Sequence, residues 1–117
     1  MHVQFNTDES VDGREALGRH AEDLVRRVLG HFSEAITRVE IHLSDVNAHK
    51  GGDRDKRCLM EARLAGRQPI AVRDEAGTLH QALDGAADKL RRAIDSTLGK
   101  REDAKRSATT PPGGDPD

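Results

Sequence analysis

The side chains of this chain that could do chemistry are mainly lysines and arginines, which gather in two segments. Residues 50–73 and residues 89–106 each hold seven basic and three acidic side chains, while the whole chain of 117 residues has a net charge of −2. Neighbouring cations act on an anion together, because salt screens mainly the charges that lie farther away. The two segments therefore predict a phosphate-binding surface, and the overall charge excludes only binding to polyanions over the whole surface.

The second segment falls in a helical pattern that separates its charges. At about 100° per residue, Lys89, Arg92 and Lys100 fall with Ser96 on one flank of an apolar stripe. A different sector collects three aspartates and one arginine: Asp84, Asp88, Asp95 and Arg91. A surface helix that needs only solubility more often mixes the two signs. The pattern favours a basic edge that meets an anion, although accidental sorting on a solvated face would look the same.

A second cationic cluster stands at the end of a long polar connection and comprises three residues: Arg54, Lys56 and Arg57. The first helical segment adds Arg27 on a flank of its own apolar stripe. The two aromatic residues, Phe5 and Phe32, both fall on apolar faces. Stacking of splayed-out bases on aromatic rings is therefore not expected, and RNA recognition would use phosphates, riboses and shape.

Metal binding has only weak signals in this sequence. Six histidines are scattered without the i, i+4 pair and glutamate of a helical zinc site: His2, His20, His31, His42, His49 and His80. The segment Asp45-x-Asn47-x-His49 resembles the start of a calcium loop. It has Lys50 where that loop needs glycine and Lys56 where it needs glutamate. We therefore expect no metal ion.

Covalent catalysis has no better signal. Cys58 is the single cysteine, so it can form no internal disulfide, and its inward position on a strand predicts a buried thiol. Gly51-Gly52 lacks the Lys-Ser/Thr and the helix start of a nucleotide-binding loop. The residues therefore predict a protein that is not an enzyme and has no cofactor and no small-molecule substrate. A metal-dependent hydrolase using His42, Asp45 and His49 is the least favoured alternative.

Four segments alternate between apolar and polar residues, as half-buried strands do. They are residues 2–6, residues 38–44, residues 57–65, and a short strand at Ile70 and Val72 after Pro69. Residues 66–68 are short enough for a hairpin turn. Leu59 is the large apolar residue of these strands that falls on the outward side.

Two segments have apolar residues at spacings of three and four, as amphipathic helices do. The first covers residues 13–30, and the second runs from residue 79 to about residue 101. The expected N-terminal caps are Asp12 with Glu15 and Thr78 with Gln81.

The element order β-α-β-β-β-α predicts an α+β domain over residues 1–102, with both helices packed on one face of a four-stranded mixed sheet. A right-handed crossover makes the first two strands parallel, and the last three form an antiparallel meander. Residues 103–117 are expected to form a disordered tail. Neither a membrane span nor a secretory signal is present in the sequence, so we expect a cytoplasmic protein.

Three segments stand in an order that is more specific than any one of them: Arg38-Val-Glu-Ile-His-Leu-Ser-Asp-Val-Asn, Gly52-Asp-Arg-Asp-Lys-Arg-Cys58-Leu-Met-Glu-Ala-Arg and Leu79-His-Gln-Ala-Leu-Asp-Gly-Ala-Ala-Asp-Lys-Leu90-Arg-Arg. Over about residues 1–102, the chain resembles the short form of the ribosome hibernation-promoting factor family, which includes the ribosome-associated inhibitor and the sigma-54 modulation proteins. The last segment is the most diagnostic of the three.

The resemblance implies a fold similar to a double-stranded-RNA-binding domain. It also implies binding of the 30S ribosomal subunit in the mRNA and tRNA channel, facing 16S rRNA, and inhibition of translation under stress. Basic residues of both helices would face the rRNA: Lys89, Arg92, Lys100, Arg101, and Arg26 or Arg27. Cations of residues 50–57 complete the expected site: Lys50, Arg54, Lys56 and Arg57. The short form would lack the dimerisation domain of long members, be a monomer off the ribosome and have no membrane partner.

A second function class stays open at this point. The outward side chains of the strands could bind a regulatory protein, with no RNA target: Arg38, Glu40, His42, Glu61, Arg63 and Arg73.

Overall fold

The computed structural model describes residues 1–8, 11, 13–45 and 55–109, with side chains described as far as Gly99. Its elements are β1 (His2–Thr7), α1 (Arg14–Leu29), a 3₁₀ turn (Gly30–Phe32), β2 (Ile36–Asp45), β3 (Lys56–Leu64), β4 (Ile70–Ala76) and α2 (Leu79–Thr109). The predicted element order β-α-β-β-β-α is confirmed.

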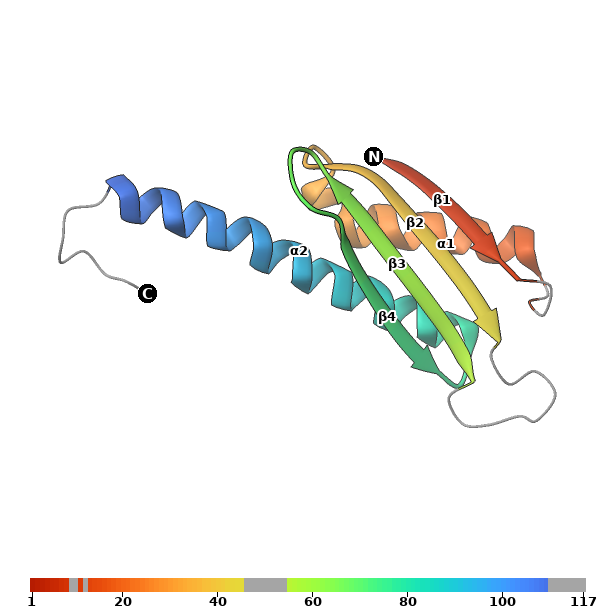
Figure 1. Ribbon diagram of the computed structural model, residues 1–117. Helices are drawn as coiled ribbons and strands as arrows, with labels where there is room; N and C mark the ends of the chain where they lie inside the picture. The colour runs from red at the N-terminus through yellow and green to blue at the C-terminus, as the bar shows by residue number, and fades with distance from the viewer. Residues whose placement is uncertain (9–10, 12, 46–54, 110–117) are drawn as a thin grey trace.

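The four strands form one mixed sheet in the order β1-β2-β3-β4 (Figure 1). β1 pairs parallel to β2, and β3 pairs antiparallel to β2 and to β4, as the crossover and meander predict. The β3–β4 connection includes Gly66, whose φ of 70° is costly for a residue with a Cβ. The predicted α+β fold class is therefore confirmed down to the direction of each strand.

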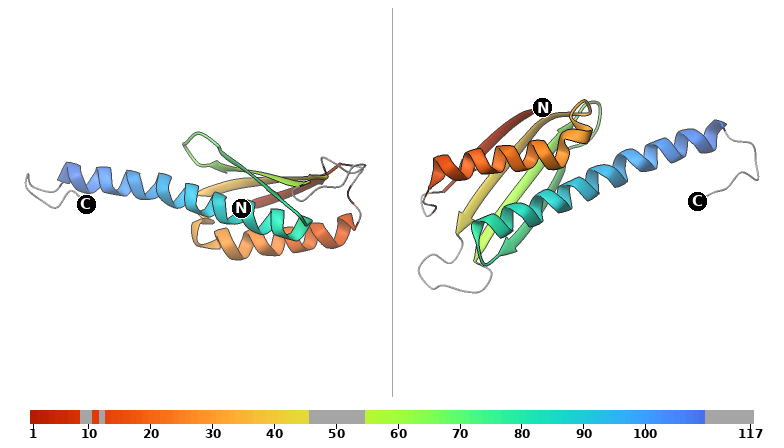
Figure 2. Two further views of the ribbon diagram at one scale, coloured as in Figure 1. Left: turned by 90° about the horizontal axis from the view of Figure 1, so that it is seen from below. Right: turned by 180° about the vertical axis from the view of Figure 1, so that it is seen from behind.

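Both helices cover the same face of the sheet, which leaves the other face open (Figure 2). The covered face supplies the alternate strand residues, among them Val39, Ile41, Leu43, Cys58 and Met60, which are all buried. The helices bury their apolar stripes against them: Leu17, Ala21, Leu24, Val25, Leu29, Ala82, Leu83, Ala86, Ala87, Leu90 and Ile94. Removal of this apolar surface from water is the main favourable term in folding. On the open face, Leu59 is 41% exposed, as predicted.

The two helices begin in different ways. Thr78 Oγ1 accepts a hydrogen bond of 3.0 Å from the Gln81 backbone N–H, which confirms the predicted cap of α2. The predicted Asp12 cap of α1 is wrong, because the N-cap is Gly13, with φ 70° and no side-chain cap hydrogen bond. Gly13 can adopt this left-handed conformation without strain, so the backbone turn itself starts the helix. Asp12 lies outside the described residues.

α2 is longer than predicted, because it continues to Thr109 rather than ending near residue 101. Residues 100–109 contain neither glycine nor proline and are mostly good helix formers. Pro111 then disfavours a helical residue before it. Residues 103–109, which were expected to be disordered, are therefore helical. This last part of α2 extends past the sheet (Figure 1), and residues 110–117 lie outside the described part of the chain.

Candidate nucleic-acid interface

A groove runs between the two helices on the side of the molecule away from the sheet. It has a volume of about 450 Å³ and takes its apolar lining from Leu24 and Val28 of α1. Arg27 of α1 and Arg91 of α2 line it as cations, and two aspartates of α2 also line it: Asp84 and Asp88. The groove thus brings the predicted residue Arg27 to the same side as Arg91, which the sequence pattern had placed in the acidic sector, and acidic residues lie among them.

Arg26 and Arg27, the two candidates on α1, differ in their surroundings. The Arg26 guanidinium pairs with Glu22 at 2.9 Å and donates to the Met1 carbonyl at 3.3 Å. Arg27 is exposed beside the groove and has no ion pair with any residue that the structure describes. Of the two, Arg27 is the cation that can meet an external anion without first leaving a partner.

Lys89 is half exposed, and its ammonium group contacts β4. Its Nζ lies 2.9 Å from Asp74 Oδ1 and donates to the Arg73 carbonyl at 2.9 Å. Asp74 reaches α2 over Gly85, where an added Cβ would overlap its carboxylate. This close approach requires glycine in the middle of a helix, where it is otherwise unfavourable. Lys89 therefore holds β4 against α2, in addition to any role in binding.

Arg91 and Arg92 share one carboxylate, that of Asp88. Arg92 lies 2.6 Å from Asp88 Oδ2 and Arg91 lies 3.2 Å from Asp88 Oδ1. The predicted separation of a basic edge from an acidic stripe is therefore wrong at Asp88. The reason is local: side chains three and four residues apart are neighbours on a helix. Asp95 has no ion pair in the described part of the chain.

Lys56 and Arg57, the described members of the second cationic cluster, are also paired. Lys56 Nζ lies 3.0 Å from Asp55 and 3.1 Å from Asp45, so it joins the ends of β2 and β3. The hydrogen bonds that Lys56 donates to Asp55 and to Asp45, the first having the larger effect, raise the pKa of Lys56 above its ordinary value. Arg57 pairs with Glu75 of β4 at 3.1 Å.

Four of the predicted binding residues cannot be placed in this site. Lys50 and Arg54 lie outside the described residues. Lys100 and Arg101 belong to α2, beyond the last described side chain.

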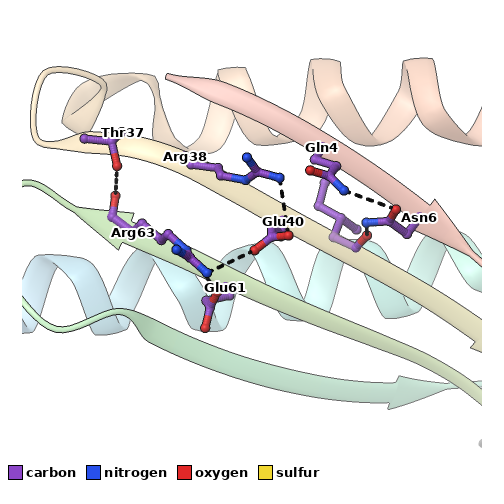
Figure 3. A network of polar contacts seen from close by, with 8 residues as sticks. Gln4, Asn6, Thr37, Arg38, Glu40, Glu61 and Arg63 are labelled. Carbon is purple, nitrogen blue, oxygen red and sulfur yellow. Dashed lines mark hydrogen bonds and ion pairs between the residues drawn. The ribbon is translucent and has the colours of Figure 1, made fainter.

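The open face of the sheet carries a network of charged side chains (Figure 3). Glu40 and Glu61 stand directly opposite each other on β2 and β3. Arg63 lies 3.7 Å from Glu40 and 3.5 Å from Glu61, and Arg38 lies 3.5 Å from Glu40. Arg63 thereby offsets the repulsion that two opposed carboxylates would otherwise cause. The charges of this face are largely neutralised within the sheet.

Two features of the helical side were missed from the sequence. The rings of His20 and His80 stack 4.5 Å apart at 9° and join α1 to α2, although we expected scattered, solvated histidines. The sequence pattern did not predict that Asp74 pairs with Lys89. Gly85 in the interior of the helix was the available signal, because a glycine there can indicate that another element packs closely against the helix.

The part of the chain that the structure describes contains no group of three His, Cys, Asp or Glu that could hold a metal ion. Cys58 is buried, and burial and then the charge of Asp74 raise its pKa to about 12. His42 is exposed and Asp45 pairs with Lys56, while His49 lies outside the described residues. Within the described residues, no helix is long and apolar enough to cross a membrane.

Several solved structures are similar to this chain, and two of them illustrate the likeness. One is the crystal structure of the Thermus thermophilus Protein Y N-terminal domain, with 18% identity and a TM-score of 0.67, covering 83% of this chain and 99% of that chain. The other is a ribosomal subunit interface protein from Coxiella burnetii, with 20% identity and a TM-score of 0.63, covering 85% of this chain and 99% of that chain. At these identities, the likeness shows a shared fold.

A comparison with curated proteins finds no match. A comparison with protein families matches residues 6–102 to the family described as Sigma 54 modulation protein / S30EA ribosomal protein. The match covers the last two residues of β1, all of α1, β2, β3 and β4, and α2 as far as residue 102. The chain therefore belongs to the sigma 54 modulation protein / S30EA ribosomal protein family, whose members are ribosome-associated binding proteins rather than enzymes.

Proposed function

We propose that this protein binds 16S rRNA of the 30S subunit in the mRNA and tRNA channel, and that it inhibits translation in the cytoplasm as a monomeric hibernation factor. The observation that carries the proposal is that Arg27 of α1 and Arg91 of α2 line one groove on the helical face. Arg92, which is 72% exposed, joins them through Asp88. Family membership supports the ribosome as the partner.

The binding would depend on phosphate contacts rather than base stacking. Phe5 lies over Gly18 of α1, and Phe32 packs against the edge of His31, so the aromatic rings serve the fold. Arginines that contact phosphates release counterions, which makes affinity fall with salt. Such contacts position a protein on RNA by shape and charge.

The structure divides the expected rRNA-binding residues into two groups. Arg27 and Arg92 are the most available, and we propose them as principal phosphate contacts, with Arg91 beside them. Arg91 and Arg92 must first leave Asp88, and four other residues must also leave a partner: Arg26, Lys89, Lys56 and Arg57. Lys50, Arg54, Lys100 and Arg101 stay proposed contacts on the sequence alone.

The alternative is a protein partner on the open face of the sheet. Leu59 is exposed there beside a hollow of about 250 Å³ that Glu40, Glu61 and Ala71 also line. An apolar centre surrounded by paired charges is common in protein interfaces. This arrangement favours a small protein-docking surface as the second candidate.

Sedimentation with purified 30S subunits separates the two candidates. We expect the wild-type protein to cosediment at low salt and to dissociate at high salt. Arg27→Ala with Arg92→Ala should lose at least tenfold in affinity, whereas Arg63→Ala on the open face should bind like wild type. Loss of 30S binding in Arg63→Ala with retention in the double variant would place the interface on the sheet instead. A wild-type protein that does not cosediment at low salt would contradict the proposed function.

A further inference from the structure

Asp88 occupies an unusual position among the acidic residues of α2. Its two carboxylate oxygens are divided between two arginines, with Oδ2 at 2.6 Å from Arg92 and Oδ1 at 3.2 Å from Arg91. It also lines the groove between the helices, next to Arg27. One carboxylate thus neutralises part of the charge of two residues that the proposed function needs.

These contacts are at the surface and can be exchanged. The Asp88 side chain is 43% exposed, Arg91 is 44% exposed and Arg92 is 72% exposed. Exposed pairs of this kind are weak in water, so they contribute little to folding. A phosphate offers a guanidinium the same type of charge-assisted hydrogen bond that a carboxylate does. An approaching RNA backbone can therefore replace Asp88 at both arginines.

The Lys89–Asp74 pair is built differently. Asp74 is only 16% exposed, and it lies against Gly85 where two elements meet. Breaking that pair would leave a largely buried carboxylate without its cation, which is costly. Asp74 therefore serves the packing of β4 on α2, whereas the two ion pairs of Asp88 are with arginines of its own helix.

We propose that Asp88 is an internal competitor for RNA phosphates, which holds Arg91 and Arg92 in the free protein and limits the affinity of the interface. This inference rests on the proposed function and specifies how the same site is regulated. In the free protein the three charges of this cluster amount to a single positive charge. When RNA binds, its phosphates replace the Asp88 carboxylate as partners of the arginines. An RNA backbone therefore gains the full contact only when it presents phosphates to both Arg91 and Arg92.

The test compares Asp88→Asn with Asp95→Asn in 30S binding by the full chain at several salt concentrations. Asp95 is the matched control, because it lies on the same helix two turns away, removes the same charge and has no ion pair within the described residues. We expect Asp88→Asn to bind about threefold to tenfold more tightly than wild type, and Asp95→Asn to change affinity less than twofold. The salt dependence should steepen in Asp88→Asn alone, since more counterions are released.

A second background shows whether Asp88 acts through the arginines. In a protein with Arg91→Ala and Arg92→Ala, adding Asp88→Asn should no longer increase affinity. An equal increase in that background, or equal gains from Asp95→Asn, would mean general repulsion of phosphates and would overturn the inference. If the wild-type protein binds 30S subunits and Asp88→Asn binds them with the same affinity, the inference about Asp88 is overturned but the proposed function is not. Absence of 30S binding in both proteins overturns the proposed function and this inference together.

Discussion

At the scale of single residues, Lys89 and Arg92 have different roles although they lie three positions apart. Lys89 is 52% exposed but bonds to Asp74 and the Arg73 carbonyl, whereas Arg92 forms its ion pair with Asp88 of its own helix. The sequence pattern predicted that Lys89 and Arg92 are equivalent cations on one flank of the helix. The structure makes one of them part of the contact between β4 and α2.

We predict that Lys89→Ala lowers the free energy of unfolding by about 1 kcal/mol, because it leaves the Asp74 carboxylate without its cation. Arg92→Ala should change it by less than about 0.5 kcal/mol, as exposed substitutions usually do. Urea unfolding of the two variants followed by circular dichroism checks this. Equal stabilities would show that the Lys89–Asp74 pair contributes nothing measurable to the fold.

The thiol of Cys58 should be unreactive in the folded protein. Burial first, and the Asp74 carboxylate second, raise its pKa from 9.0 to about 12, so the reactive thiolate is scarce at pH 8. Ellman's reagent should label it only after unfolding. Because the folded pKa is raised, the contribution of this group to stability is complete below pH 9 and is lost as the pH rises toward 12. Rapid labelling of the native protein at pH 8 would contradict the buried position.

At the scale of elements, α2 contains two described glycines that should respond to alanine in opposite directions. At Gly85 an added Cβ would overlap Asp74, while at Gly99 it would meet no other described part of the chain within 4 Å. Alanine is the better helix former by about 1 kcal/mol. Sequence alone would therefore assign the same stabilising effect to both substitutions.

We predict that Gly85→Ala destabilises the protein by about 1–3 kcal/mol, because β4 must move or Asp74 must leave Lys89. Gly99→Ala should stabilise it by up to about 1 kcal/mol. The midpoint of thermal unfolding reports both changes. The Gly99→Ala variant serves as the control for helix propensity. A Gly85→Ala protein as stable as Gly99→Ala would mean that Asp74 does not pack over the helix.

At the scale of the whole molecule, the two faces of the sheet carry different arrangements of charge. The helical face carries the groove with Arg27 and Arg91, and the open face carries charges that are paired across strands. The net charge of −2 gives little long-range attraction to RNA. Affinity must then come from a few local contacts.

We predict that 30S affinity falls with salt along a slope of about −2 to −3, for the three phosphate contacts of Arg27, Arg91 and Arg92. The fraction bound in filter or gradient assays between 50 and 200 mM KCl measures this slope. Removing one arginine should reduce the slope by about one. A slope near zero would indicate an interface without phosphate contacts and would favour the open face of the sheet.

Most of the fold could be predicted from the sequence, because the relevant patterns are local. Alternation over residues 38–44 and 57–65 identified the buried face of each strand, including Leu59 as the exception. Spacings of three and four located both helices, and chirality then determined strand direction. The start of α1 and the end of α2 were predicted less well, since they depend on the backbone of Gly13 and on residues without an apolar stripe.

The state of the candidate site was decided by tertiary structure. The sequence by itself determined which residues are cationic and that both helices carry some of them. It could not determine which cations are paired, because Arg57–Glu75 depends on the register of β3 and β4, and Lys89–Asp74 depends on the packing of α2 against β4. A charge is available to RNA only when its neighbours in space leave it free, and those neighbours exist only once the sheet and helices have packed.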